Sequence, residues 1–255
     1  MSKVINIYKP IGLTPLQLVD QYKALYPSSD KVSYMGRLDP LAHGVILLLV
    51  GDINKQRDQF LSLDKTYKFK VWLGIATDSY DLLGELTQNK WQSPPNNWQE
   101  LLKNFINQNT GSITQNYPPY SSKPVKGHAL FWWAKQGRLN EIDMPHKIVQ
   151  ITSFRLINQS TVDLRSAVKI AINKISLVNG DYRQESSIRK WQELAEVSTD
   201  TEVIELELEI ECTSGTYVRE IVHNLGLFLG CGAVVVEINR TKMGEYLLED
   251  SIYLD

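Results

Sequence analysis

Asp39 is the side chain whose surroundings best suit chemistry. It lies in the stretch Gly36–Gly44, with the sequence GRLDPLAHG, directly before the apolar run Val45–Val50. Such a run is typical of a buried strand. A carboxylate beside a buried strand costs free energy unless a partner or a function keeps it there. An Asp before a Pro also makes turns, so this stretch alone leaves a turn residue and a catalytic carboxylate as alternatives.

Two further side chains could serve such a carboxylate. Tyr67 begins the apolar side of the alternating stretch Lys65–Gly74, which is typical of a strand. Arg219 falls, with Tyr217, in the first turn of a helix that is predicted to follow Thr213–Thr216, where a cation opposes the helix dipole. That position favours a carboxylate partner, with an exposed surface arginine as the alternative. Asp39 is therefore the conspicuous carboxylate of the sequence, and Tyr67 and Arg219 are its candidate partners.

Other common chemistries lack their residue patterns in this sequence. The four histidines lie at positions 43, 128, 146 and 223, and no Cys/His spacing matches a zinc site, so we expect no metal. Glycine-rich phosphate loops and a G-x-S-x-G elbow are also absent. The glutamates of Glu202–Cys212 alternate with apolar residues, which predicts a strand with a solvated face rather than a catalytic carboxylate pair.

Length and composition indicate a globular cytoplasmic protein. The 255 residues suffice for one large domain or two small ones, and 43% of them are hydrophobic. The longest apolar run is far too short to span a bilayer, and the N-terminus has no signal-peptide layout. Cys212 and Cys231 are too few for a disulfide framework, which favours reduced thiols. The net charge of -2 argues weakly against a nucleic-acid partner, but the glutamates of one predicted strand account for it.

The periodic patterns predict elements that mix helices and strands. A helix begins after Thr14 with Pro15 at its first position, and another carries apolar side chains from Trp98 onward. Residues 160–199 contain two helical patterns, Leu164–Val178 and Asp181–Val197, with Asp181 available as the cap of the second. We predict an α+β protein with a central mixed, largely antiparallel sheet, flanking helices and an inserted helical hairpin at about 160–199.

Residues 111–138 resemble a long surface loop. Pro and Gly are frequent there, and the loop carries Lys123, Lys126 and His128 before Trp132 and Trp133. Cations and aromatic rings suit an RNA backbone and its bases. A solvated loop over a tryptophan-filled patch explains the same composition, so both interpretations stand at this point.

Five separated stretches and the Asp39 segment together resemble one family. The stretch GRLDPLAHG resembles the G-x-L-D-P-x-A-x-G signature of the TruB family of tRNA pseudouridine synthases. The other stretches occur in the family's order, and they are YKPIG at 8–12, DKTY at 64–67 with LGIATDSYD at 73–81, PYSSKPVKG at 119–127, CTSGTYVR at 212–219 and GCGA at 230–233. Any one of these stretches alone would be weak, but together they cover nearly the whole chain.

This resemblance implies a fold, a reaction and a partner. The fold is that of pseudouridine synthases, with residues 1–255 as one catalytic domain. The reaction isomerises a uridine in tRNA to pseudouridine, usually at position 55 in the T loop, and needs no metal, nucleotide or redox cofactor. Many relatives continue into a C-terminal PUA RNA-binding domain, and we expect none here because the chain ends at Asp255. We expect a monomer that binds the T-arm of tRNA, in the cytoplasm and without a membrane.

The resemblance also implies residue roles. Asp39 matches the nucleophile, which attacks the ribose or the base, and Arg219 matches the arginine that pairs with it and keeps it ionised in a dry pocket. Tyr67 matches the tyrosine that packs against the target base. Tyr217 and Ile238 match positions that line the base pocket, which the base reaches by leaving its stack. The 111–138 loop matches the segment that grips the tRNA arm, with Lys123, Lys126 and His128 as the RNA-binding residues.

One departure from the family leads to a second hypothesis. The family commonly has His-Thr before its signature, whereas this chain has Tyr34-Met35. Tyr34 can stack on a base but cannot be a cation, so we expect altered base recognition or a reduced rate. A tRNA-binding folding chaperone without catalysis is therefore the alternative function, although the trio of Asp39, Tyr67 and Arg219 argues against it. A change of substrate to another RNA is a third possibility.

Overall fold

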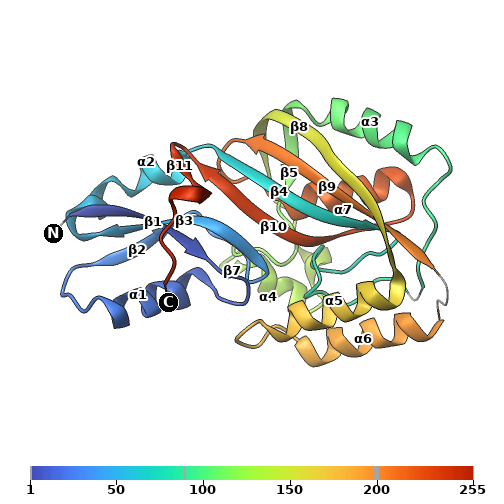
Figure 1. Cartoon of the computed structure of the whole chain (residues 1–255), viewed down its shortest axis with the longest axis horizontal. Coiled ribbons are helices and arrows are strands. Elements are labelled where there is room, and N and C mark those ends of the chain that lie inside the picture. The colour runs from blue at the N-terminus through green and yellow to red at the C-terminus, as the bar shows by residue number, and fades with distance from the viewer. Residues whose placement is uncertain (1, 89, 198–200, 255) are drawn as a thin grey trace.

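The fold is built on one large, twisted sheet. It is seen in a computed structural model that describes residues 2–88, 90–197 and 201–254. Within these residues the sheet has nine strands, seven of them in the order β1-β3-β10-β4-β9-β8-β5, with β2 on β3 and β11 on β10 (Figure 1). The strands are β1 (Lys3–Lys9), β2 (Val32–Met35), β3 (Ala42–Val50), β4 (Lys65–Leu73), β5 (Gly111–Asn116), β8 (His146–Asp163), β9 (Glu202–Cys212), β10 (Ala233–Met243) and β11 (Tyr246–Leu247).

Mixed strand directions confirm the predicted fold class. Strands β3 and β10 run parallel, whereas the other paired strands of the described sheet run antiparallel. The parallel pair matters because it places Ala42 of β3 beside Ile238 of β10. The Asp39 segment ends in the first residues of β3, so the sheet brings the end of that segment against β10.

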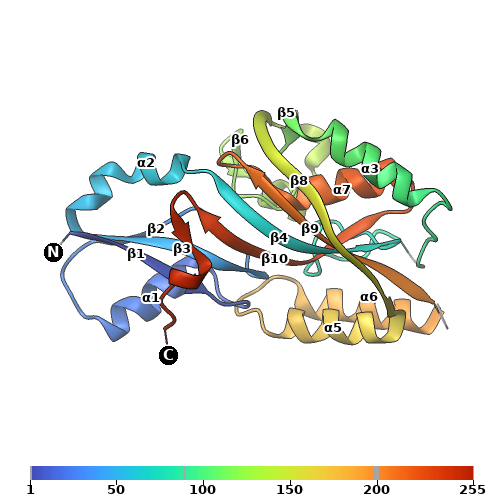
Figure 2. The ribbon, with the colours of Figure 1, turned by 45° about the horizontal axis from the view of Figure 1, so that its top comes forward.

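Helices cover both faces of the sheet. The helices α3 (Trp98–Gln108) and α7 (Val218–Leu229) lie on one face, and α5 (Leu164–Ser176) and α6 (Gln184–Val197) lie on the other (Figure 2). The alternation of β4 explains this arrangement. Phe69 and Val71 point into the core cluster under α7, whereas Trp72 points into the cluster under α5 and α6. A third cluster lies between the sheet and α1 (Pro15–Leu25).

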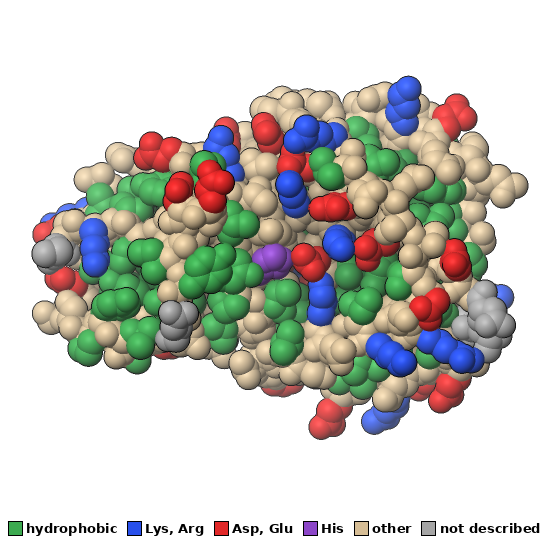
Figure 3. Space-filling view, viewed as in Figure 1, with side chains coloured by type: hydrophobic (Ala, Val, Ile, Leu, Met, Phe, Trp, Pro, Cys, Tyr) green, Lys and Arg blue, Asp and Glu red, His purple; other side chains and the backbone are tan. Residues whose placement is uncertain are grey.

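Several predicted elements are confirmed. The helix after Thr14 begins at Pro15, and the Thr14 and Gln17 side chains form a reciprocal capping box. The strand over Glu202–Cys212 has the predicted bounds. Its polar face is not simply solvated, because neighbouring strands bring cations to it. Glu209 is buried and accepts a 2.8 Å hydrogen bond from Arg155 Nε, and Figure 3 shows Lys and Arg mixed with Asp and Glu over this part of the face.

The helical insertion is real, but its boundaries differ from the prediction. Residues 160–163 continue β8, because that strand stays paired with β9 as far as Asp163. Asp163 then caps α5 by accepting a 2.9 Å hydrogen bond from the Ser166 amide. Asp181 does not cap α6, which begins at Gln184. Residues 198 and 199 of the predicted insertion lie outside the described residues.

The segment 111–138 is not one long loop. Its first six residues form the edge strand β5, paired with β8. Farther on, β6 (Pro124–Val125) and β7 (His128–Ala129) form a hairpin with a two-residue turn, and α4 (Leu130–Lys135) follows it. Lys126 and Gly127 both have positive φ, +46° and +85°, as a tight hairpin turn of this length requires. The sequence pattern failed here because short strands carry too few residues to show an alternation.

Two further observations concern the cysteines and the apolar character of the helices. Cys212 and Cys231 are both free and buried. Among the described residues, no helix combines the length and the apolar character that crossing a membrane requires.

Candidate active site

A cavity of about 770 Å³ lies where the Asp39 segment, the start of α7 and strand β10 meet. Its walls come from segments that are far apart in the sequence, including the residues around Tyr120 and the connection between α5 and α6. Six of the nine residues predicted for the site line this cavity, and they are Asp39, Tyr67, Arg219, Tyr34, Tyr217 and Ile238. The fold therefore assembles the predicted centre in one place.

Asp39 and Arg219 form a two-point ion pair. Arg219 Nε donates to Asp39 Oδ2 at 2.7 Å, and Arg219 Nη2 donates to Oδ1 at 3.2 Å. The Arg219 side chain is 3% exposed, whereas that of Asp39 is 37% exposed. A fork of two hydrogen bonds fixes the plane of the carboxylate as well as its position. Asp39 is thus held from below and presented to the open space of the cavity.

Further acceptors surround the guanidinium of Arg219. Its Nη1 donates to the Ser79 carbonyl at 2.8 Å and its Nη2 to the Tyr120 carbonyl at 3.3 Å, while Asp81 Oδ2 lies 3.6 Å from Nε. Burial lowers the pKa of Arg219, but the charges of Asp39 and Asp81 outweigh it, so the net pKa lies above its ordinary value. Arg219 therefore stays a cation inside the cavity.

Asp81 is a buried carboxylate that the sequence prediction did not single out. Ser79 Oγ donates to its Oδ1 at 2.6 Å, and the Leu83 amide donates to the same oxygen at 3.1 Å. Burial raises the pKa of Asp81 above its ordinary value. Asp81 closes the LGIATDSYD stretch at 73–81, so the signal for it was present as a motif without a role.

Arg240 holds the Asp39 segment from the side of β10. It is almost fully buried, and its guanidinium donates to the carbonyls of Val45 at 2.6 Å and Gly36 at 3.0 Å. Gly44 must be glycine, because it has φ +108° and a Cβ atom there would lie 2.3 Å from the Arg240 carbonyl oxygen. The signature around Asp39 is thus fixed at both ends by one buried arginine.

The remaining lining residues supply aromatic and apolar surface. Tyr67 is buried on β4, and burial raises the pKa of Tyr67, so its hydroxyl stays protonated at neutral pH. Tyr217 precedes α7, and its backbone is held by the Gln115 side chain through hydrogen bonds of 2.8 and 3.0 Å. Tyr34 lies on β2, where it lines the cavity and also packs against the core cluster under α1.

The three predicted RNA-binding residues do not line the cavity. Lys126 Nζ donates to the Glu141 carbonyl at 2.9 Å, and Lys123 Nζ lies 5.2 Å from the centre of the Tyr117 ring. The His128 ring stacks on Trp132 with 4.0 Å between ring centroids. These residues lie on and beside the β6–β7 hairpin, and only neighbouring residues of the same segment reach the cavity wall.

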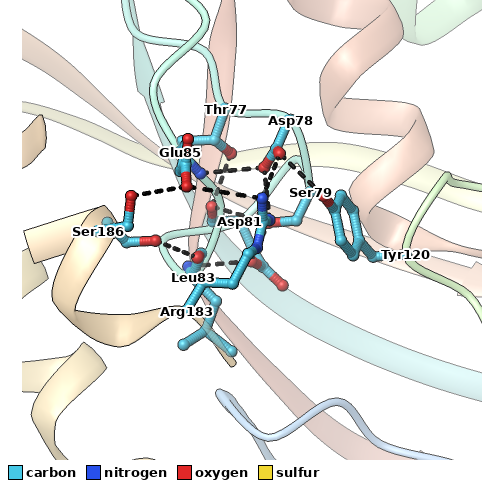
Figure 4. Close-up of polar contacts among 10 residues, drawn as sticks. Thr77, Asp78, Ser79, Asp81, Leu83, Glu85, Tyr120, Arg183 and Ser186 are labelled. Atoms are coloured by element: carbon cyan, nitrogen blue, oxygen red, sulfur yellow. Dashed lines mark hydrogen bonds and ion pairs between the residues drawn. The ribbon is translucent and has the colours of Figure 1, made fainter. Parts of the chain in front are cut away.

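A network at the cavity wall joins residues that the sequence patterns did not connect. Arg183, in the connection between α5 and α6, donates to both carboxylate oxygens of Asp78, at 2.9 and 3.0 Å (Figure 4). Tyr120 donates its hydroxyl hydrogen to Asp78 Oδ2 at 3.0 Å, and its ring lies 4.5 Å below the Arg183 guanidinium carbon. Arg183 and Asp78 are 105 positions apart, so no local pattern could pair them.

A second network lies behind the Asp39 segment. His43 contacts the Tyr8 hydroxyl at 3.1 Å and Glu237 Oε1 at 3.3 Å, and Lys174 Nζ of α5 donates to Glu237 Oε2 at 2.7 Å. The hydrogen bonds from His43 and Lys174 lower the pKa of Glu237 to about 2. Across the described ranges, no group of three or more His, Cys, Asp and Glu side chains could hold a metal ion.

Comparison with known proteins identifies the family. The model of the N-terminal domain of TruB family pseudouridylate synthases matches residues 23–182. The chain belongs to the TruB family. A tRNA pseudouridine synthase B of Protochlamydia amoebophila is 32% identical over 254 residues, which cover 99% of this chain and 78% of that protein. The enzyme of the same name from Clostridioides difficile is 29% identical and is matched over 70% of its length.

Solved structures of larger assemblies contain chains with a similar fold. A Cbf5-Nop10-Gar1 complex matches with a TM-score of 0.59 and 19% identity over 98% of this chain. An H/ACA RNP bound to a substrate RNA containing 2'-deoxyuridine matches with a TM-score of 0.57 and 18% identity. This chain spans about half the length of these two structural neighbours, at 52% and 50%. At such identities the likeness concerns the fold alone, and it confirms the predicted pseudouridine synthase fold.

Proposed function

We propose that this chain isomerises a uridine of tRNA to pseudouridine, with Asp39 as the nucleophile and position 55 of the T loop as the target. The observation that carries the proposal is the pairing of Asp39 with Arg219, in which both carboxylate oxygens accept hydrogen bonds at the floor of the cavity. Membership of a family of pseudouridylate synthases supports the reaction. A nucleophilic carboxylate must be aimed at the reacting atom, and the two-point contact fixes its position and its plane.

The reaction balances without an oxidant or a reductant. The bond from N1 of the base to C1′ of the ribose breaks, a bond from C5 to the same carbon forms, C5 loses a proton and N1 gains one. A covalent link to Asp39 would hold the base or the ribose during the exchange, and the carboxylate leaves again at the end. Arg219 keeps Asp39 oriented throughout, because it also donates to the Ser79 and Tyr120 carbonyls.

The cavity walls suit a base that has left its stack. Tyr67, Tyr217 and Tyr34 offer aromatic faces, and Ile238 offers an apolar surface beside Asp39. Outside the cavity, Lys123, Lys126 and His128 suit the phosphates of the T-arm stem and loop. The substrate would then lie across the β6–β7 hairpin with one nucleotide inserted toward Asp39.

The six predicted residues that line the cavity meet at one place in the chain. We propose that residues 1–255 act as one catalytic domain and as a monomer, on tRNA in the cytoplasm. Size-exclusion chromatography with light scattering, with and without tRNA, tests the monomer. A dimer at micromolar concentration would contradict it.

Site-resolved mapping of pseudouridine tests the reaction. Unmodified tRNA is incubated with the purified protein and with the Asp39→Asn variant, whose folding is checked by circular dichroism and thermal unfolding. The wild-type protein is expected to convert position 55, and Asp39→Asn to lower the rate by about 1,000-fold or more, since it removes the nucleophile. Turnover by the variant at the wild-type rate would exclude Asp39 as the nucleophile. Tight tRNA binding with no altered uridine would favour the chaperone alternative.

A further inference from the structure

The tip of the helical hairpin forms one wall of the catalytic cavity. Residues 179–183, which connect α5 to α6, all line the cavity that contains Asp39. Tyr182 is half-buried there, and burial together with the negative charge of Asp39 raises the pKa of Tyr182. The hairpin is therefore part of the site rather than an appendage on the far face of the sheet.

Arg183 is held in this wall in an unusual conformation. Its φ is +62°, a left-handed backbone that a non-glycine residue adopts only at a cost in free energy. Its side chain makes two hydrogen bonds to Asp78, lies over the Tyr120 ring and comes within 3.8 Å of Glu85 Oε1 (Figure 4). The surrounding contacts outweigh the backbone cost, and such local strain often accompanies function.

The partners of Arg183 adjoin the acceptors of Arg219. Asp78 directly precedes Ser79, whose carbonyl accepts from Arg219 Nη1 at 2.8 Å. Tyr120, which stacks under Arg183, also offers its own carbonyl to Arg219 Nη2 at 3.3 Å. Arg183 thus ties together the two segments whose carbonyl oxygens aim the guanidinium of Arg219, and Arg219 in turn aims Asp39.

The hairpin is anchored firmly enough to serve as a fixed support. Trp191 of α6 is fully buried and donates to the Leu82 carbonyl at 3.3 Å. Ser187 donates to the Leu83 carbonyl at 2.7 Å, and Ser186 donates to Glu85 at 2.7 Å. These bonds join α6 to the same loop that carries Asp78, so Arg183 cannot shift without moving that loop.

We infer that Arg183 is a positioning residue for catalysis, acting through Asp78 and Tyr120 on Arg219 and through Arg219 on Asp39. The inference rests on the proposed function. It predicts that losing the Arg183 side chain slows the chemical step while leaving tRNA binding nearly unchanged, because the Arg183 guanidinium already donates to both carboxylate oxygens of Asp78 and lies over the Tyr120 ring. A residue that only stabilised the fold would lower the unfolding temperature without this separation of rate and binding.

The test compares Arg183→Gln with Arg189→Gln, an equivalent change at an exposed arginine of α6. Single-turnover rates of pseudouridine formation are measured at saturating enzyme. Dissociation constants for unmodified tRNA are measured with each change combined with Asp39→Asn, so that no turnover occurs. For Arg183→Gln we expect a rate lower by about 10- to 100-fold, since small misplacements of catalytic groups have effects of this size, and a dissociation constant within about three-fold. Arg189→Gln should match the wild-type protein in both.

Two results would overturn the inference. One is a saturating rate for folded Arg183→Gln within about two-fold of wild type, and the other is a loss confined to tRNA binding. If Arg183→Gln does not fold, Arg183→Lys decides, because it keeps the charge near Asp78 but loses the two-point contact. A slower rate with unchanged binding would then support the role, and a wild-type rate would refute it. Absence of pseudouridine with the wild-type protein would instead refute the proposed function, and the inference with it.

Discussion

The buried arginines and the β6–β7 lysines differ in what surrounds their charges. Arg219 and Arg240 are almost completely buried, and their guanidinium groups donate to backbone carbonyls and, for Arg219, to Asp39. Lys126, in contrast, is exposed at a tight turn, and Lys123 is half-buried with its ammonium near the Tyr117 ring. All four are cations close to the proposed substrate, but their different burial gives them different roles.

The difference follows from the cost of burying charge. A guanidinium inside the protein must have acceptors for its hydrogens, so each buried arginine is fixed in position and fixes its partners. An exposed ammonium remains hydrated, so its charge costs little free energy. It attracts phosphates over distances comparable to the Debye length. We therefore expect the arginines to act on the rate of the chemical step and the lysines on tRNA affinity.

Among changes to the buried arginines, Arg219→Gln should have the largest effect on the rate of the chemical step. It removes both hydrogen bonds to Asp39 and leaves Asp81 without its cation. We expect the single-turnover rate to fall by about 100- to 1,000-fold and the free energy of unfolding to fall by about 3 kcal/mol. Pseudouridine mapping and urea unfolding measure the two quantities. A variant with the wild-type rate would contradict the placement of Arg219 in the catalytic centre. It would also contradict the expectation that the buried arginines act on the rate.

The centre could be predicted from sequence because its residues lie in stretches with strong local patterns. Alternation located Tyr67 on β4, the dipole argument gave Arg219 a carboxylate partner, and the resemblance joined both to Asp39. Asp81 was within a matched stretch, but nothing local showed that Arg219 would contact it as well. The pairing of Arg183 with Asp78 depends on how the inserted hairpin docks, which is a property of packing between distant segments.

The segment 111–138 shows a different limit. Its strand β5 is an edge strand that pairs only with β8 in the described sheet. Burial alternates along it, but only Ile113 of the inward positions Gly111, Ile113 and Gln115 is a large apolar residue, so the sequence shows no apolar alternation. The β6–β7 hairpin has only two residues in each strand. In such short elements the turn residues dominate the composition, so the stretch resembles a loop even though it is paired.

The double change Lys123→Gln with Lys126→Gln tests the other side of the comparison. We expect tRNA to bind about 10-fold more weakly at 0.1 M salt, and the slope of log affinity against log salt to become shallower by about one to two units. The saturating single-turnover rate should change less than three-fold. Filter binding at several salt concentrations measures the affinity.

The matched control for the lysines is Lys103→Gln with Lys169→Gln, on α3 and α5. Both of these lysines are exposed, and neither lines the cavity. The control should bind tRNA with the wild-type salt dependence. If the control weakened tRNA binding as much as the change of Lys123 and Lys126, the β6–β7 hairpin would not be a specific tRNA-binding site. A diffuse attraction by surface charge would then explain binding.

Glu237→Gln tests an ion pair of intermediate burial and should have a modest effect on the free energy of unfolding. The Glu237 carboxylate accepts hydrogen bonds from His43 and Lys174. They lower its pKa to about 2, below the value of 4.5 in an unfolded chain. A lowered carboxyl pKa stabilises the folded state above about pH 4.5, and this stabilisation is lost as the pH falls from 4.5 toward 2. At pH 7 the variant should therefore be less stable by about 1 to 2 kcal/mol, allowing for its partial exposure.

The pH dependence separates this ion pair from simple packing. The difference in the free energy of unfolding between wild type and Glu237→Gln should shrink as urea unfolding is repeated at pH 7, 5, 4 and about 3, because a protonated Glu237 is as neutral as the glutamine that replaces it. Glu196→Gln, at an exposed position of α6, should show no such trend. A difference that stayed constant from pH 7 to 3 would mean that Glu237 acts through its shape. The electrostatic link from α5 through Glu237 to His43 would then contribute nothing to the support behind the Asp39 segment.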